Sequence, residues 1–209
     1  MKKRILSILL LCCMVLTMLP TTVLAADGPM DTIPKYDVSI DVYNRTSDIS
    51  IKDSRSYYIY SSVPDKLRDT WAWDKKIFIK GDKTAPHVFI DGVNIEMSPS
   101  SKGPAIELNK KASAYIYFIG KNSSLQGADG RAAIQKNRSE GQLYVLARTG
   151  TTVTCKGGDK AAGIGGSYAT RNISNGYYNG DMYGHGVNMH FGSQSNPDYW
   201  GGTIAAIGG

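Results

Sequence analysis

VFI at residues 88–90 is followed at a fixed interval of 28 residues by two similar phrases, IYF at 116–118 and YVL at 144–146. Each phrase leads into a turn marked by glycine. A fixed period of roughly 20 to 50 residues is typical of solenoid proteins, whose units bury their apolar faces only by stacking on one another. The repeat therefore predicts a solenoid.

The repeated phrases have the character of β-strands. They are short, rich in β-branched and aromatic residues and separated by Gly, Asn and Asp, and no window shows sustained helical periodicity. If strands one coil apart pair in parallel, equivalent residues stack at about 4.8 Å. This register places three sets of residues in columns: Val88, Ile116 and Tyr144 in one core column, Ile90, Phe118 and Leu146 in the next, and Phe89, Tyr117 and Val145 facing outward.

A second and a third apolar strip accompany the first in each coil. The same period places Val93 and Ile95 near Leu125 and Val153, which forms the second strip. The third strip comes from a small residue followed by isoleucine, which recurs at Ile106, Ile134 and Ile164. Three strips per coil, joined by turns, describe an all-β fold: a right-handed parallel β-helix with about 28–30 residues per coil.

The first 25 residues have the three parts of an export signal. A basic start, Lys2 to Arg4, precedes an apolar run and a small-residue cleavage site ending at Ala25. The apolar run is shorter than the roughly 20 residues that a bilayer requires, so we expect cleavage and no membrane span afterwards. The predicted location is secreted or cell wall-associated.

Charge and cysteine content limit the partners and cross-links that the mature chain is expected to have. Removing residues 1–25 takes away three of the 24 Lys and Arg and none of the 18 Asp and Glu, which leaves 21 against 18, a net charge of +3. No basic block remains, so nucleic acid is not an expected partner. Cys155 is the one cysteine left, and it has no partner for an internal disulfide.

The chain divides into four predicted parts. A signal peptide at 1–25 and a linker at 26–35 precede an N-terminal β cap at 36–75 and the coils at 76–209. Residues 63–74 fit either one helical turn or a loop. A Gly- and Asn-rich segment at 167–200 is too long for the repeat and is expected to protrude as a loop. Because the last apolar phrase would leave a strand edge uncovered, we expect a chain truncated at its C-terminus.

Four stretches resemble secreted and surface proteins of Gram-positive bacteria that are described as right-handed β-helix or carbohydrate-binding-domain proteins. They are VFIDGVNIEM (88–97), GPAIEL (103–108), GADGRAAIQ (127–135) and TVTCKGGDKAAGIGGS (152–167). The resemblance implies a β-helix with Gly-rich turns in an extracellular protein. It implies little about activity, because the group's label is a fold-level inference.

The long segment 167–200 carries the predicted glycan-binding residues. They are Tyr177, Tyr178, Tyr183, Tyr199 and Trp200. Aromatic faces stack on the C–H faces of sugars, and long loops on solenoids are often the binding face. The alternative is that these aromatic side chains pack the loop onto the coils. His185 and His190 in the same segment match no closed zinc pattern, so no metal site is predicted there.

Asp129 and Asp159 form the candidate catalytic pair, each five residues before the isoleucine of its coil. With Arg131 and Lys160 beside them, stacked carboxylates could cleave a polysaccharide or hold Ca²⁺. Aspartate next to glycine is also the ordinary composition of a tight turn, and this interpretation is the stronger one. No cofactor is predicted apart from this calcium alternative.

Trp71 and Trp73 would share one face if their segment were extended. Exposed, they would form a sugar platform; buried, they would close the end of the core, which the sequence favours.

Three functions remain open from the sequence. The first is a non-catalytic extracellular β-helix that binds or displays glycan, with a polysaccharide or glycoconjugate as partner. The second is a polysaccharide lyase or glycosidase on the same scaffold. The third is a structural stalk or adhesin spacer.

Overall fold

The computed structural model describes residues 34–101, 103–109, 111–136, 140–166, 189–191 and 200–208. The predicted signal peptide and all but two residues of the predicted linker lie outside these ranges. Within them the chain forms β-strands and two short 3₁₀ turns, η1 (Asp65–Leu67) and η2 (Pro99–Ser101). No helix among the described residues is long and apolar enough to cross a membrane.

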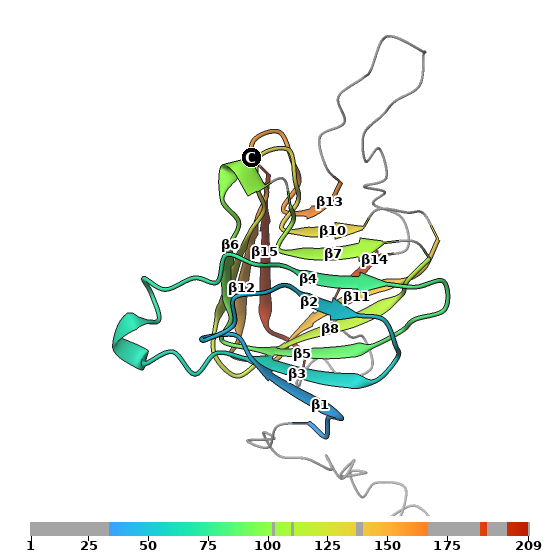
Figure 1. Cartoon of the computed structure of the whole chain (residues 1–209), viewed down its shortest axis with the longest axis horizontal. Coiled ribbons are helices and arrows are strands. Elements are labelled where there is room, and N and C mark those ends of the chain that lie inside the picture. The colour runs from blue at the N-terminus through green and yellow to red at the C-terminus, as the bar shows by residue number, and fades with distance from the viewer. Residues whose placement is uncertain are drawn as a thin grey trace, which may run out of the picture. The chain divides into compact units, whose positions relative to one another are not determined.

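The strands form three parallel sheets (Figure 1). Sheet A consists of β1 (Val38–Asp41), β3 (Ser56–Tyr60), β5 (His87–Asp91), β8 (Ala114–Ile119), β11 (Leu143–Ala147) and β14 (Met189–Phe191). Sheet B consists of β2 (Ile49–Ile51), β4 (Ile77–Lys80), β7 (Ile106–Asn109), β10 (Ile134–Lys136) and β13 (Ile164–Gly165). Sheet C consists of β6 (Asn94–Glu96), β9 (Ser123–Gln126), β12 (Thr152–Lys156) and β15 (Thr203–Ile207). From β5 onward the chain visits the sheets in the fixed order A, C, B, which confirms the predicted parallel β-helix.

The core lies between the three sheets, where every second residue of each strand points inward. In sheet B, Ile106, Ile134 and Ile164 are directly paired, as the repeat predicts, and Ile77 and Ile49 extend the same column. Equal side chains one above another fill each layer alike. The column therefore packs each coil against the next.

The prediction for the third phrase of the repeat was wrong by one residue. Val88 pairs with Ile116 as expected, but Ile116 pairs with Val145 and not with Tyr144. Val145 is therefore fully buried, whereas Tyr144 faces outward and Leu146 belongs to the outer column beside Tyr117. Because side chains alternate with a period of two, a slip of one residue reverses the face of the whole strand.

Residues 36–75, the predicted N-terminal cap, contribute β1, β2 and β3 to sheets A and B: β1 pairs with β3, whereas β2 and β3 pair in parallel with β4 and β5. The predicted loop at 167–200 contains a strand: β14 pairs with β11, with Met189 opposite Leu143. Residues 167–188 and 192–199 lie outside the described part of the chain.

Candidate functional site

A groove lies between the segment that joins β3 to β4 and the outer face of sheet C. Its volume is about 120 Å³, and it is partly open to solvent. Its wall consists of residues 69–72, which include Trp71, and its floor consists of residues 94–96 of β6 with Ser124 and Gln126 of β9. We call this feature the Trp71 groove.

The backbone that forms the wall of the Trp71 groove changes from a helical turn to an extended conformation within a few residues. Leu67 donates its N–H to the carbonyl of Pro64 at 2.8 Å, and Trp71 donates its N–H to the carbonyl of Leu67 at 2.9 Å, so the chain is coiled up to Trp71. Trp73 then donates to the carbonyl of Asn94 at 2.8 Å and forms a parallel bridge with Ile95. The segment that fitted either a turn or a loop is therefore a helical turn followed by a strand-like bridge.

This change of geometry separates the two tryptophans, which do not share a face. Trp73 lies in the core with 2% of its surface exposed, and its Nε1–H donates to the carbonyl of Arg45 at 2.8 Å. Trp71 is half-buried and packs edge to face against Tyr43, with ring centroids 5.4 Å apart. Trp73 is thus a buried member of the core, and Trp71 packs against the core from outside while it also lines the groove.

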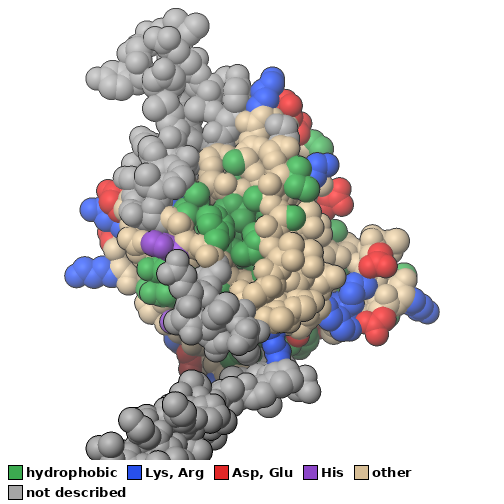
Figure 2. Space-filling model, turned by 180° about the vertical axis from the view of Figure 1, so that it is seen from behind, with side chains coloured by type: hydrophobic (Ala, Val, Ile, Leu, Met, Phe, Trp, Pro, Cys, Tyr) green, Lys and Arg blue, Asp and Glu red, His purple; other side chains and the backbone are tan. Residues whose placement is uncertain are grey.

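The segment that carries η1 and Trp71 projects from the coils, and Figure 2 shows acidic and basic side chains side by side on this projection. The basic ones include Arg68 and the acidic ones include Asp65 and Asp69. Charges of both signs at close range form ion pairs, which help to hold a projecting segment in one conformation.

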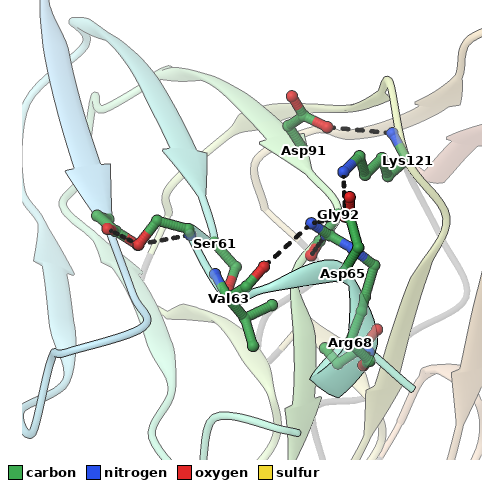
Figure 3. Close-up of polar contacts among 10 residues, drawn as sticks. Ser61, Val63, Asp65, Arg68, Asp91, Gly92 and Lys121 are labelled. Atoms are coloured by element: carbon green, nitrogen blue, oxygen red, sulfur yellow. Dashed lines mark hydrogen bonds and ion pairs between the residues drawn. The ribbon is translucent and has the colours of Figure 1, made fainter. Parts of the chain in front are cut away.

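Arg68 anchors the segment that carries Trp71 (Figure 3). Its guanidinium group donates to the carbonyls of Gly92 and Val63 at 3.3 and 3.4 Å, and only 17% of the side chain is exposed. Asp65 pairs with Arg68 at 3.2 Å and with the Lys121 Nζ at 2.7 Å. The Lys121 ammonium group, followed by the Arg68 guanidinium group, holds the pKa of the Asp65 carboxyl below its usual value.

Asp91 positions the turn that presents Lys121. Its carboxylate accepts a hydrogen bond from the Tyr58 hydroxyl at 2.8 Å and another from the Lys121 N–H at 3.1 Å. Gly120, which precedes Lys121, has a φ of +68°. It lies so close to the Asp91 carboxylate that a Cβ atom would overlap with it. Only glycine adopts this turn without strain, so the anchor of the groove depends on the glycine of the repeat.

The floor of the groove is the polar face of two strands. Because side chains alternate, Ile95 and Leu125 point into the core, and their neighbours on β6 and β9 point outward. Asn94 is committed to structure: its amide donates to the Arg68 carbonyl at 2.9 Å and accepts from the Ser124 N–H at 3.0 Å. It thereby ties the wall of the groove to its floor.

Three other side chains of the floor are available to a ligand. Glu96, Ser124 and Gln126 make no side-chain hydrogen bond or ion pair with any residue of the described chain. Together they present carboxylate, hydroxyl and amide groups in the groove that the partly exposed Trp71 also lines. A mainly polar floor with one aromatic wall suits a ligand that has both hydroxyl groups and apolar C–H faces.

The outer face of sheet A carries a second aromatic feature, which we call the aromatic ladder: His87, Tyr115, Tyr144 and His190. Neighbouring rings are 4.7, 4.5 and 4.4 Å apart and lie within 14° of parallel. The faces of the two tyrosines are therefore covered by the rings above and below, which leaves their edges for solvent. Such a ladder stabilises the stacking of coils but offers little ring face to a sugar.

Trp200 is the one predicted glycan-binding residue within the described ranges. It is half-buried and packs against Tyr117, with ring centroids 5.1 Å apart and planes tilted by 40°. Phe89, Tyr58 and Ile119 belong to the same outer cluster. Tyr177, Tyr178, Tyr183 and Tyr199 lie outside the described residues, as does His185. Trp200 thus contacts the coils, as the packing alternative in the sequence expects.

The structure places Asp129 and Asp159 in stacked turns of neighbouring coils. Gly130 donates its N–H to the Asp159 carbonyl at 2.9 Å, and Gly158 donates to the Arg131 carbonyl at 3.0 Å. Both aspartates are exposed, and Asp159 pairs with Lys160 at 3.6 Å. The turns are thus held by their backbones, which agrees with the turn interpretation. No group of three or more His, Cys, Asp or Glu in the described ranges could hold a metal ion.

Cys155 is fully buried in the core, and burial raises the pKa of its thiol to about 12. The thiol is therefore protonated at neutral pH, and the thiolate, which is the reactive form, is scarce. We predict that a water-soluble disulfide reagent labels less than about one-tenth of Cys155 in the native mature chain at neutral pH. In guanidinium chloride the same reagent should label the thiol completely. Rapid labelling of the native chain would contradict this burial.

The Trp71 groove was not predicted from the sequence, although part of its signal was present. Asn94 and Ser124, and likewise Glu96 and Gln126, are polar residues separated by 30 positions, on either side of the buried Ile95 and Leu125. This alternation indicates an outward polar face. Nothing local indicates that residues 69–72 fold over it. In comparisons with protein-family models, curated proteins and solved structures, nothing matched this chain.

Proposed function

We propose that this chain is an extracellular, non-catalytic parallel β-helix that binds a polysaccharide or glycoconjugate in the Trp71 groove. The observation that carries the proposal is that the partly exposed Trp71 lines one groove with the unpartnered side chains of Glu96, Ser124 and Gln126. The export signal predicted at residues 1–25 supports an extracellular or cell wall location.

Sugar rings match this groove chemically. Their C–H faces are apolar and pack on an indole, whereas their hydroxyl groups both donate and accept hydrogen bonds. Gln126 offers donors and acceptors, Ser124 offers a hydroxyl, and Glu96 accepts only. A groove of about 120 Å³ holds a small part of a polymer, so several weak contacts along the chain would supply affinity.

The polar face of sheet C continues beyond the groove and offers those further contacts. Ser124 pairs with Thr154, and Gln126 pairs with Lys156, so each polar column extends into the next coil. Successive strands lie about 4.8 Å apart, which makes the face a regular row of polar groups along the helix axis. An extended polymer that lies along this axis would meet equivalent groups in each coil.

The structural stalk is the second candidate, and the aromatic ladder favours it. Rings stacked at 4.4 to 4.7 Å bind coil to coil and resist shear between strands. This role is compatible with glycan display, because a rigid rod holds the groove away from its attachment point.

Affinity electrophoresis of the mature chain in native gels that contain polysaccharide tests the proposal. We expect wild type to be retarded by at least one polymer and Trp71→Ala to lose about tenfold in affinity, since removal of an anchor aromatic costs about 1–3 kcal/mol. Phe78→Ala is the matched control, because Phe78 is a half-buried outward aromatic residue on sheet B, outside the groove. Equal retardation of wild type and Trp71→Ala would exclude the groove. Release of reducing ends that disappears in Glu96→Gln would overturn the non-catalytic part.

A further inference from the structure

Two carboxylates belong to the Trp71 groove, one from each part that forms it. Asp69 comes from the wall and Glu96 from the floor. Both side chains are exposed, and neither carboxylate makes a hydrogen bond or ion pair with the described residues. The groove therefore carries two negative charges that have no ion-pair partner among the described residues.

Four cationic side chains of the neighbouring segments are engaged elsewhere. Arg68 binds two carbonyls and Asp65, and Lys121 binds Asp65 at 2.7 Å. Lys75 pairs with Asp74 at 2.7 Å. Lys76 pairs with Glu107 at 2.7 Å. No Lys or Arg is among the residues that line the groove. The lining of the groove therefore carries two negative charges and no positive one, and an exposed cation, Lys156, lies opposite Gln126 on the neighbouring strand β12.

The third element is Trp71, which lines the same groove as these carboxylates. The face of an indole attracts a cation through its quadrupole, and an ammonium group also donates hydrogen bonds to carboxylates. An aromatic ring with two acceptor-only groups is therefore selective for a ligand that carries an amine. A neutral ligand would leave both carboxylates without a counter-charge, and an anionic ligand would be repelled by them.

We propose that the Trp71 groove selects glycans that carry free, protonated amino groups, that is, polymers of amino sugars without their N-acyl groups. The inference rests on the proposed function, because it names the class of glycan bound in the same groove. The hydroxyl groups and C–H faces contact Ser124, Gln126 and Trp71, and the ammonium groups contact Asp69 and Glu96. Acidic polysaccharides are excluded by the same two charges.

A matched pair of ligands tests the selectivity: chitosan oligomers and the same oligomers after full N-acetylation, which differ only in the amine. We expect wild type to bind the amine form about three- to tenfold more tightly at low salt, as for one or two exposed ion pairs. Because exposed charges are screened, this preference should disappear at about 0.5 M salt, while binding of the acetylated form changes little.

Variants of the full mature chain separate the inference from the proposed function. Asp69→Asn with Glu96→Gln keeps the shape of the groove and should abolish the preference for the amine form. Asp82→Asn is the control, because Asp82 is an exposed carboxylate outside the groove with no described partner. Melting temperatures of all variants should equal that of wild type, since neither Asp69 nor Glu96 stabilises the fold through a contact.

Each outcome decides one of the two statements. Equal binding of both oligomers that is lost in Trp71→Ala would overturn the amine selectivity and leave glycan binding in the groove. A preference that persists in the double variant would place the amine elsewhere and overturn the inference as well. If a neutral polymer is retained but neither oligomer is, only the amine selectivity is overturned. If no polymer is retained, both the selectivity and the proposed glycan binding are overturned.

Discussion

Gly158→Ala is expected to destabilise the coil stack by about 3 kcal/mol or more, because a Cβ atom at this position has no room. It would overlap with the backbone carbonyl of Ala128 in the coil below, and it would lie 2.8 Å from the Asp129 nitrogen. The obstructing atoms are backbone in a turn that is itself hydrogen-bonded to the next coil, so they cannot move away without breaking those bonds. Guanidinium unfolding of the mature chain, followed by circular dichroism, measures the loss.

Gly150→Ala is the matched control for this change. Gly150 has a φ of +84°, and no atom lies within 4 Å of the point that a Cβ atom would occupy. Alanine there therefore suffers only the strain of the left-handed backbone, about 1 kcal/mol. If Gly158→Ala is no less stable than Gly150→Ala, the stacked turns have room for a methyl group. Glycine in these turns would then not be required for close packing.

Phe118→Ala is expected to lower the free energy of unfolding by about 3–5 kcal/mol. Phe118 is fully buried on sheet A, with Ile90 paired on one side and Ala147 on the other. Because Ala147 is small, the phenyl ring fills the space of its layer, and its removal leaves a cavity that the rigid columns cannot close. Thermal and chemical unfolding of the mature chain both report this loss.

Phe78→Ala removes the same ring from an outward position and serves as the control. Phe78 is half-buried, with the ammonium groups of Lys76 and Lys80 at 4.9 and 5.0 Å from its ring centroid. Such exposed cation–π contacts are worth about 0.5–1 kcal/mol each, so the expected loss is less than half of that for Phe118. Similar losses for both variants would contradict the assignment of inward and outward faces on these strands.

The fold could be predicted because the repeat is visible without any knowledge of distant contacts. In sheet B, a small residue before each isoleucine marked the register, and Ile106, Ile134 and Ile164 are paired as the spacing indicates. The strand at 143–147 gave no such mark, since Leu, Tyr, Val, Leu and Ala are all apolar or amphipathic. Alternation cannot be read from such a strand, and the prediction for Tyr144 was wrong by one residue.

The two tryptophans show why the candidate site could not be predicted in the same way. A spacing of two positions implies one face only in an extended chain, and Trp71 ends a coiled turn, whereas Trp73 begins a bridge. The turn is held by Arg68, whose partners include the carbonyl of Gly92, 24 positions away. No local pattern reports such a contact.

The sequence by itself determined the kind of fold, the period of the coil and the inward isoleucine column, because each depends on a pattern that repeats every 28 to 30 residues. Only the tertiary structure decided which aromatic side chains are accessible. The rings of Tyr115 and Tyr144 stack on each other, which covers their faces. Trp71 is partly exposed and lines the same groove as Glu96. The physical reason is that accessibility is set by the residues that pack against a side chain from other coils, and these come from distant parts of the chain.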